Sequence, residues 1–385
     1  MALSPPCSNE ELLARTHLRE VGCRVYEWCG HESEEQRAME AGPVHIFGGV
    51  LISQAAAAAM HAMRSVEKEE EKEEEELELQ SPNRQGQRRV RLNSLHGSFC
   101  RRGDGRKNVL YTVEGLQEGG SFTRVSVHAR QGGILLFTAI VSLSILSTTP
   151  SKTGKKQYDN AAFQRVAALP RDVVPPEAAH SFVDSVRALP LPWASRAARI
   201  GEESVKSRNG FARVYVLSAD KEPMLEWSVR TRNTLNDAIK TRRRSGIESG
   251  LSELDIDDRS TQRVWMKFDG GAAGEDRAAH VCLLLHLSDM LFIDTAIHRY
   301  GLALGNSIVR PLSLDHAIHM HDDDEKTDED SWRVDAYLLF EISVVTIRNG
   351  RALCQSKIYS RRGGHIATAV QEGLLKLDDR AKPRL

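Results

Sequence analysis

The stretch FTRVSVHARQGGILLFTAIVSLSILSTT, residues 122–149, decides the fold. Apolar and polar residues alternate from Val125 to Arg130, and no charge appears from Gly132 to Thr149. The Gln131-Gly132-Gly133 sequence between these two parts is typical of a tight turn. The uncharged run approaches the length that spans a bilayer, but its many β-branched and hydroxyl residues favour a buried strand. The stretch therefore predicts a β-hairpin.

The same pattern recurs near the C-terminus, at residues 337–370. Gly119 to Gly132 and Gly350 to Gly363 are each thirteen residues apart. A candidate helix precedes each hairpin, over residues 50–63 and from about His286 to Tyr300. Between helix and hairpin lies a Leu-x-x-x-His sequence, at Leu92 to His96 and at Leu312 to His316. A helix followed by an antiparallel meander, twice, indicates a duplicated α+β unit.

The intervening composition predicts how the chain divides. We expect an N-terminal unit over residues 1–150 with an acidic insertion at 64–88, a linker over 151–209, and a C-terminal unit over 210–385. The charged run Glu67 to Glu76 either extends the first helix or forms a solvated insertion, and either way needs no ligand.

Charge and cysteine usage narrow the function classes. Lys plus Arg (52) nearly cancels Asp plus Glu (53), so the chain lacks the basic excess of a general nucleic-acid binder. The six cysteines form no Cys-x-x-Cys pair and the N-terminus shows no signal region, which favours a reducing intracellular compartment. Pro383-Arg384-Leu385 resembles the peroxisomal Ser-Lys-Leu address, so we expect a peroxisomal or cytoplasmic protein.

Three polar residues stand where the surrounding pattern is apolar: Asp289, Ser313 and Gln371. A buried polar group without a partner costs about 1 to 3 kcal/mol, so such residues usually have a partner or a task. Each also has a plain structural interpretation. Asp289 can pair within its helix, Ser313 can be an ordinary strand serine, and Gln371 can satisfy the end of a strand.

Six short segments along the chain form a recognisable series. They are Phe47-Gly48-Gly49, Leu95-His96-Gly97-Ser98-Phe99, Arg102-Gly103-Asp104, Leu287-Ser288-Asp289, Ser313-Leu314-Asp315-His316 and Val370-Gln371-Glu372-Gly373. In these segments and in their order the chain resembles acyl-CoA thioesterase II, the bacterial and peroxisomal enzymes built as two hotdog folds in one chain. The similarity covers roughly residues 44–63, 90–146 and 264–376. It implies an α+β tandem (double) hotdog, in which each antiparallel sheet wraps around a central helix.

The resemblance also implies the catalytic residues. The family uses an Asp from the second helix, a Thr or Ser from the following strand and a Gln from the last strand, which correspond to Asp289, Ser313 and Gln371. A carboxylate can accept a proton from water while the hydroxyl and the amide orient it, and N–H groups at a helix start can receive an oxyanion. No cofactor or metal is required. Ile140 or Val141 falls at the place of Gln371 in the N-terminal unit and Asn93 at that of Ser313, so we expect that unit to be chemically silent.

The predicted activity is hydrolysis of fatty acyl-CoA to fatty acid and CoA by activated water. The alternatives are a non-catalytic acyl-CoA-binding relative and a hotdog enoyl-CoA hydratase. The sequence departs from the family at residues 317–321, where Ala-Ile-His-Met-His replaces Ser-Met-Trp-Phe-His. The sequence contains neither a nucleophile elbow nor a Cys/His signature, so it does not support an acyl-enzyme mechanism. Exposed sheet edges favour a homo-oligomer, and no nucleic-acid partner or stable membrane span is expected.

The histidines near Ser313 invite a metal interpretation. On a strand His319 and His321 share one face and His316 lies on the other, so three ligands do not converge and no metal site is predicted. We expect His316 to be a buried or polar-network histidine, with a structural role shared by His96.

Overall fold

The computed structural model describes residues 18–28, 45–77, 88–117, 122–147, 167–168, 170, 214–218, 261–268, 277–299, 308–321 and 332–377. The chain forms two compact units. Unit 1 contains Met1–Ala168, Gly271–His286 and Ala317–His321, and unit 2 contains Leu169–Gly270, Leu287–His316 and Asp322–Leu385. Most of the expected linker 151–209 and the C-terminal tripeptide lie outside the described residues, and the domain boundaries at 150 and 210 stay a prediction.

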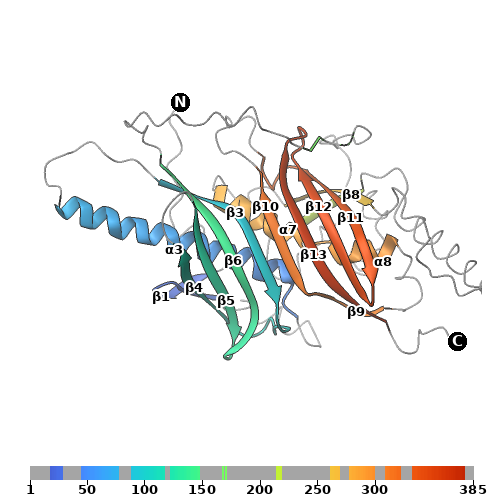
Figure 1. Cartoon of the computed structure of the whole chain (residues 1–385), viewed down its shortest axis with the longest axis horizontal. Helices are drawn as coiled ribbons and strands as arrows, with labels where there is room; N and C mark the ends of the chain where they lie inside the picture. Colours follow the sequence, from blue (N-terminus) through green and yellow to red (C-terminus); the bar gives the residue numbers. More distant parts are fainter. Residues whose placement is uncertain are drawn as a thin grey trace, which may run out of the picture. The chain divides into compact units, whose positions relative to one another are not determined.

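Unit 1 is an antiparallel sheet packed on one long helix. Its strands lie in the order β1-β2-β4-β5-β6-β3, and helix α3 (Gly48–Leu77) contacts β3 to β6 (Figure 1). This is the arrangement expected for a hotdog. The strands are β1 (Arg19–Gly22), β2 (Val25–Trp28), β3 (Arg88–Phe99), β4 (Val109–Gln117), β5 (Thr123–Gln131) and β6 (Ile134–Ser147).

Helix α3 lies close to the sheet because its inner residues are small. The run Ala55 to Ala59 is fully buried. The Tyr111 hydroxyl donates to Gln54 Oε1 at 2.6 Å, which fixes the helix to β4. The helix continues through Glu67–Glu76, so of the two alternatives for the acidic run the helical extension holds.

The predicted hairpin is confirmed. β5 and β6 pair up to Gln131↔Ile134, and the two turn residues Gly132 (φ 55°) and Gly133 (φ 82°) take left-handed backbone that glycine adopts without strain. The uncharged run is therefore a strand. Within the described residues one helical segment, Arg277–Ile297, is long and apolar enough to cross a membrane, but 83% of an apolar 18-residue window within it is buried inside the protein, as in a core helix.

Unit 2 repeats the architecture. Its sheet has the order β13-β12-β11-β8-β7 with β9 beside β13, and helix α8 (Phe292–Arg299) contacts β8, β9, β11 and β12. The chain is thus a double hotdog of the α+β class. The strands are β7 (Val214–Ser218), β8 (Thr261–Phe268), β9 (Ile308–Ser313), β11 (Leu338–Arg348), β12 (Arg351–Tyr359) and β13 (His365–Leu377), with β10 (Asp315–Met320) contributing Asp315 and His316 to unit 2.

The predicted single helix from His286 to Tyr300 is wrong. Helix α7 (Arg277–Ser288) begins earlier and ends at Ser288, and α8 begins only at Phe292. Leu291 between them has φ 68°, a left-handed conformation that is uncommon for a non-glycine residue and ends the helical path. Asp289 lies in this break.

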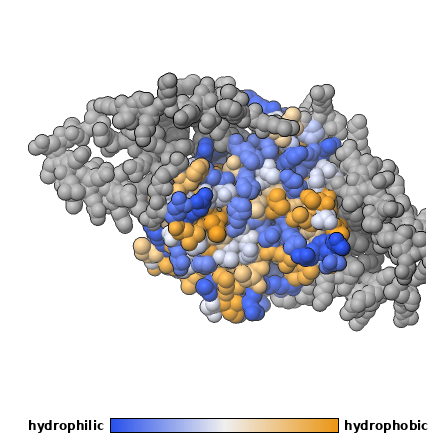
Figure 2. All heavy atoms as spheres, viewed as in Figure 1, coloured by the Kyte–Doolittle hydropathy of each residue, from blue (hydrophilic) through white to orange (hydrophobic). Residues whose placement is uncertain are grey.

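The surface of the sheets mixes apolar and polar side chains, as Figure 2 shows. Alternation along the strands turns one residue in two away from the helices. Several large apolar side chains on the described surface are about half exposed: Leu110, Leu116, Phe122, Ile134, Ile140 and Val345.

Candidate active site

The three polar residues singled out in the sequence converge in unit 2. Asp289 comes from the turn after α7, Ser313 is the last residue of β9, and Gln371 lies within β13. Gln371 Nε2 donates to Asp289 Oδ1 at 2.5 Å and to Ser313 Oγ at 2.9 Å. Side chains far apart in the sequence thus form one hydrogen-bonded group, the polar trio.

The polar trio is shielded from solvent, and the chemistry of its groups fixes which atom of the Gln371 amide donates to Asp289. Gln371 is 1% exposed and Asp289 8%, while Ser313 is half-buried. An ionised carboxylate only accepts, so the amide nitrogen of Gln371 must face Asp289, and both of its N–H groups are then used. Its Oε1 is buried and has no partner among the described residues. Such an acceptor is suited to a small donor such as water.

Asp289 was expected within the second helix, and the structure places it in the break that follows α7. Met290 N donates to Leu287 O at 3.0 Å, closing a tight turn around Asp289. Helix α8 starts directly afterwards at Phe292, so its first N–H groups, which lack helical partners, follow Asp289 along the chain. The break presents the carboxylate beside a helix start instead of along a helix side.

A glycine lets α8 approach the strand that carries Gln371. A Cβ placed on Gly373 would lie 2.3 Å from Ile293 Cδ1 and 2.6 Å from Ile293 Cγ1. Any larger residue would therefore displace the Ile293 side chain or separate α8 from β13. The sequence placed Gly373 in the matching motif, and the close approach gives its physical reason.

A thiol lies next to the polar trio but is unsuited to attack. Cys354 on β12 is the register partner of Gln371, and it is 1% exposed. Burial raises the pKa of its thiol to about 12, so it stays protonated. The thiolate needed for an acyl-enzyme is absent from this position at neutral pH, in line with the predicted water mechanism.

The histidines divide as the strand pattern predicts. His316 is fully buried, whereas His319 and His321 are exposed. Burial lowers the pKa of His316 to about 3, so its imidazole is neutral. The expectation that His96 shares this role is wrong, because His96 is exposed and its ring lies 4.9 Å from that of His319.

The corresponding places in unit 1 hold hydrocarbon. In unit 2, Ser313 pairs with Gly373, and Gly373 lies two residues after Gln371. In unit 1, the inward-facing Leu92 pairs with Leu143, and Leu143 lies two residues after the fully buried Val141. Leu92 and Val141 thus match Ser313 and Gln371. Asn93, the predicted match of Ser313, lies in a β-bulge and accepts a hydrogen bond from Ser144 at 3.1 Å.

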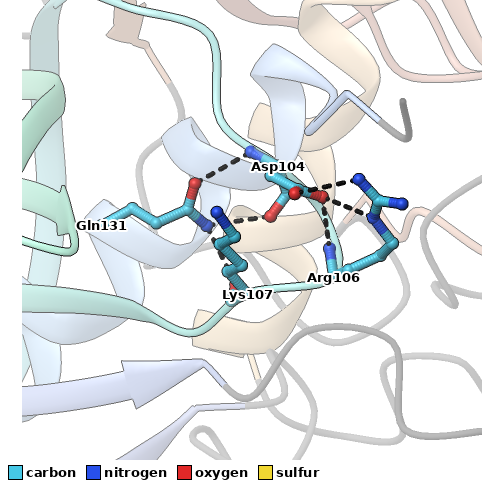
Figure 3. Close-up of polar contacts among 4 residues, drawn as sticks. All are labelled: Asp104, Arg106, Lys107 and Gln131. Atoms are coloured by element: carbon cyan, nitrogen blue, oxygen red, sulfur yellow. Dashed lines mark hydrogen bonds and ion pairs between the residues drawn. The ribbon is translucent and has the colours of Figure 1, made fainter.

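The matching motif around Asp104 braces a loop of unit 1. Gln131 Oε1 accepts from Asp104 N at 2.9 Å, and Gln131 Nε2 donates to the carbonyls of Asp104 and Lys107 (Figure 3). Arg106 holds the pKa of the Asp104 carboxyl below its usual range through side-chain hydrogen bonds. Sequence reasoning missed Gln131, whose position just before the Gly132 turn was the available signal.

Comparison with known proteins assigns both halves of the chain to one family. Residues 36–144 match the family of acyl-CoA thioesterase N-terminal domains, and residues 218–375 match that of the C-terminal domains. Acyl-coenzyme A thioesterase 8 of Mus musculus is 25% identical over 288 residues, covering 75% of this chain and 74% of the relative. Acyl-CoA thioesterase 2 of Haemophilus influenzae is 23% identical over 342 residues, covering 89% and 91%.

A solved structure shows the same fold. An acyl-CoA thioesterase II from Mycobacterium marinum superposes with a TM-score of 0.56 at 20% identity, covering 98% of this chain and 100% of the other. The two domain matches together cover most of the sequence, in the order of the family. The chain therefore belongs to the acyl-CoA thioesterase family.

Proposed function

We propose that this chain hydrolyses fatty acyl-CoA to a free fatty acid and CoA with a water molecule held by Asp289, Ser313 and Gln371. Membership of the family makes the chain a thioester hydrolase that acts on acyl-CoA. The observation that carries the residue assignment is the pair of hydrogen bonds from Gln371 Nε2 to Asp289 and Ser313.

The polar trio has the donors and acceptors that an attacking water needs. Gln371 spends both N–H groups on its neighbours, which leaves its buried Oε1 free to accept one water hydrogen. Asp289 accepts the other hydrogen, and the Ser313 hydroxyl, whose oxygen already accepts from Gln371, can donate its proton to a water lone pair. The second lone pair of the water is then directed at the thioester carbon.

The reaction balances with these groups. The water oxygen bonds to the carbonyl carbon as its proton passes to Asp289, and the N–H groups at the start of α8 stabilise the oxyanion. The tetrahedral intermediate collapses and the carbon–sulfur bond breaks. The CoA thiolate takes up the proton held by Asp289, which restores the carboxylate and releases the free thiol and the fatty acid. A positioned general base contributes about 10²- to 10⁴-fold to such a step.

Release of free thiol from acyl-CoA tests this proposal. Asp289→Ala and Gln371→Ala are each expected to lower kcat by about 100-fold or more, because the water loses its base or its orientation. Matched controls in the same unit are Asp335→Asn, which keeps shape at a carboxylate paired with Arg333, and Gln355→Ala, the strand neighbour of Cys354. Both controls should retain near wild-type turnover.

The alternatives give different results in the same assay. A wild-type protein that binds acyl-CoA but releases no thiol would be the non-catalytic relative, and an absorbance change with enoyl-CoA without thiol release would indicate the hydratase. Unchanged thiol release in both Asp289→Ala and Gln371→Ala would reject the proposed site.

Assembly and compartment are part of the same proposal. The exposed apolar residues on the sheets, Leu116 and Ile140 among them, favour association into a homo-oligomer, which light scattering would measure. We keep an intracellular location, peroxisomal or cytoplasmic, as an expectation that imaging of the tagged full chain would test.

A further inference from the structure

We infer that Asp315 and His316 are positioning residues that hold Asp289 and Gln371 at working distance, so that the segment Ser313-Leu314-Asp315-His316 clasps all three members of the polar trio. This inference rests on the proposed function, because it concerns the residues that orient the water. Neither Asp315 nor His316 hydrogen-bonds a member of the trio directly. Each instead binds a residue next in sequence to one of them.

The clasp depends on a break between β9 and β10. Ser313 ends β9, Leu314 belongs to neither strand, and Asp315 begins β10. On a regular strand residues three apart face opposite sides. Here both Ser313 and His316 face inward, since Ser313 bonds the buried Gln371 and His316 is fully buried. The break changes the alternation and allows one short segment to reach two sides of the site.

Asp315 closes the ladder that the break would leave open. Its Oδ1 accepts the backbone N–H of Glu372 at 2.7 Å, and the neighbouring Leu314 N donates to Glu372 O at 2.9 Å. Both backbone groups of the residue after Gln371 are therefore fixed. The carboxylate takes the place of a strand carbonyl and sets the depth at which the Gln371 amide enters the site.

His316 secures the other side. Its Nε2 lies 2.9 Å from Ser288 Oγ, and its ring meets that of Phe292 edge-on at 5.7 Å between centroids. Ser288 is the last residue of α7 and Phe292 the first of α8, so one imidazole contacts both ends of the break that carries Asp289.

The choice of histidine indicates a task beyond packing. His316 Nδ1 is buried without a partner among the described residues. A buried polar atom without a partner lowers the free energy of unfolding by about 1 to 3 kcal/mol. His316 lies three residues after Ser313. In unit 1 the residue three after Leu92 is Leu95, which also faces inward and is fully buried. The unit without the polar trio uses hydrocarbon there, so the imidazole is retained where the trio is present.

Variants of Asp315 separate positioning from catalysis. Asp315→Asn keeps a side-chain oxygen that can accept from Glu372 N–H, whereas Asp315→Ala removes it. We expect Asp315→Asn to retain near wild-type kcat and the same pH profile, and Asp315→Ala to lower kcat about 10-fold with little change in KM. Equal loss in both variants would assign the charge itself a role and overturn the inference, as would full activity in Asp315→Ala.

Variants of His316 test the second arm. His316→Phe keeps the ring contact with Phe292 but loses the hydrogen bond to Ser288, while His316→Gln supplies an amide N–H of similar reach. We expect His316→Phe to lower kcat roughly 10- to 100-fold at unchanged KM, with partial recovery in His316→Gln. Equal kcat in the two variants would overturn this arm, because the hydrogen bond would then have no effect.

Failure of the positioning roles of Asp315 and His316 and failure of the proposed hydrolase function give different results. If wild type releases thiol and Asp289→Ala does not, but Asp315→Ala and His316→Phe match wild type, only the positioning inference fails. If wild type releases no thiol, the proposed function fails first. Asp315 is exposed, so its variants should fold and carry the test even if His316→Phe proves unstable, which thermal melting of each variant would show.

Discussion

Exchange of Gly373 for alanine should disable the site without altering any of its polar groups. The new methyl group would lie 2.3 Å from Ile293 Cδ1, where unbonded carbons normally approach to about 3.5 to 4.0 Å. Rotation of the terminal methyl group does not relieve the clash, because Ile293 Cγ1 is also only 2.6 Å away. The clash is relieved only if the Ile293 side chain leaves its present rotamer or if α8 and β13 separate by about 1 Å, and either change disturbs the packing of α8 on β13.

The separation acts on both sides of the polar trio. Gly373 faces the same side of β13 as Gln371, and Ile293 is in the first turn of α8, which follows Asp289. Overpacking of this kind costs about 1 to 3 kcal/mol in the free energy of unfolding. A displacement of about 1 Å at reacting groups can lower the rate about 100-fold, so we expect kcat for thiol release to fall about 10- to 100-fold.

A second substitution provides the control. Ile293→Ala removes both clashing carbons, so Gly373→Ala combined with Ile293→Ala should recover much of the kcat lost in Gly373→Ala alone, with a coupling of about 1 kcal/mol or more in the double-mutant cycle. Thiol release and urea unfolding of the four proteins measure both effects. Wild-type kcat in Gly373→Ala, or strictly additive losses in the double variant, would show that the close approach of Gly373 and Ile293 does not position the site.

Three further predictions follow from the described side chains. Burial lowers the pKa of His286 and His316 to about 3, so below pH 6.5 these imidazoles bind protons in the unfolded chain but not in the folded one. The free energy of unfolding should therefore fall by about 1.4 kcal/mol per pH unit for each histidine as the pH drops from 6.5 toward 3. In urea titrations the decline should be shallower for His316→Phe than for wild type. Cys354→Ala should keep wild-type kcat for thiol release, since the buried thiol is protonated; a 100-fold loss would contradict the water mechanism. Gln131→Ala should lower the unfolding free energy by about 1 to 3 kcal/mol through the loss of its bonds to Asp104 and Lys107, and thermal melts should show this at unchanged kcat.

The sequence predicted the elements whose signals are local. The Gly132 and Gly350 turns, the uncharged strand after Gly133 and the helix over residues 50–63 each follow from backbone freedom or from the local side-chain pattern. The convergence of Asp289, Ser313 and Gln371 came from the family resemblance, and the structure brings these side chains within hydrogen-bond distance.

The features that the sequence did not predict are changes in backbone path, which the residue types at those positions do not indicate. Leu291 adopts a positive φ, which its residue type disfavours, so the helix break at Asp289 had no sequence signal. The bulge at Asn93 and the break at Leu314 each change the strand alternation. A match by sequence spacing therefore equated His96 with His316, although one is exposed and the other buried.

Single-turnover thiol release by Asp289→Asn shows directly whether the Asp289 carboxylate activates the attacking water. The amide keeps the size of the carboxylate but cannot accept a proton from water, and excess enzyme over acyl-CoA isolates the chemical step from product release. We expect Asp289→Asn to retain binding of acyl-CoA and to show a rate constant lower by about 10²- to 10⁴-fold than that of wild type. A rate constant equal to that of wild type would show that water is activated elsewhere.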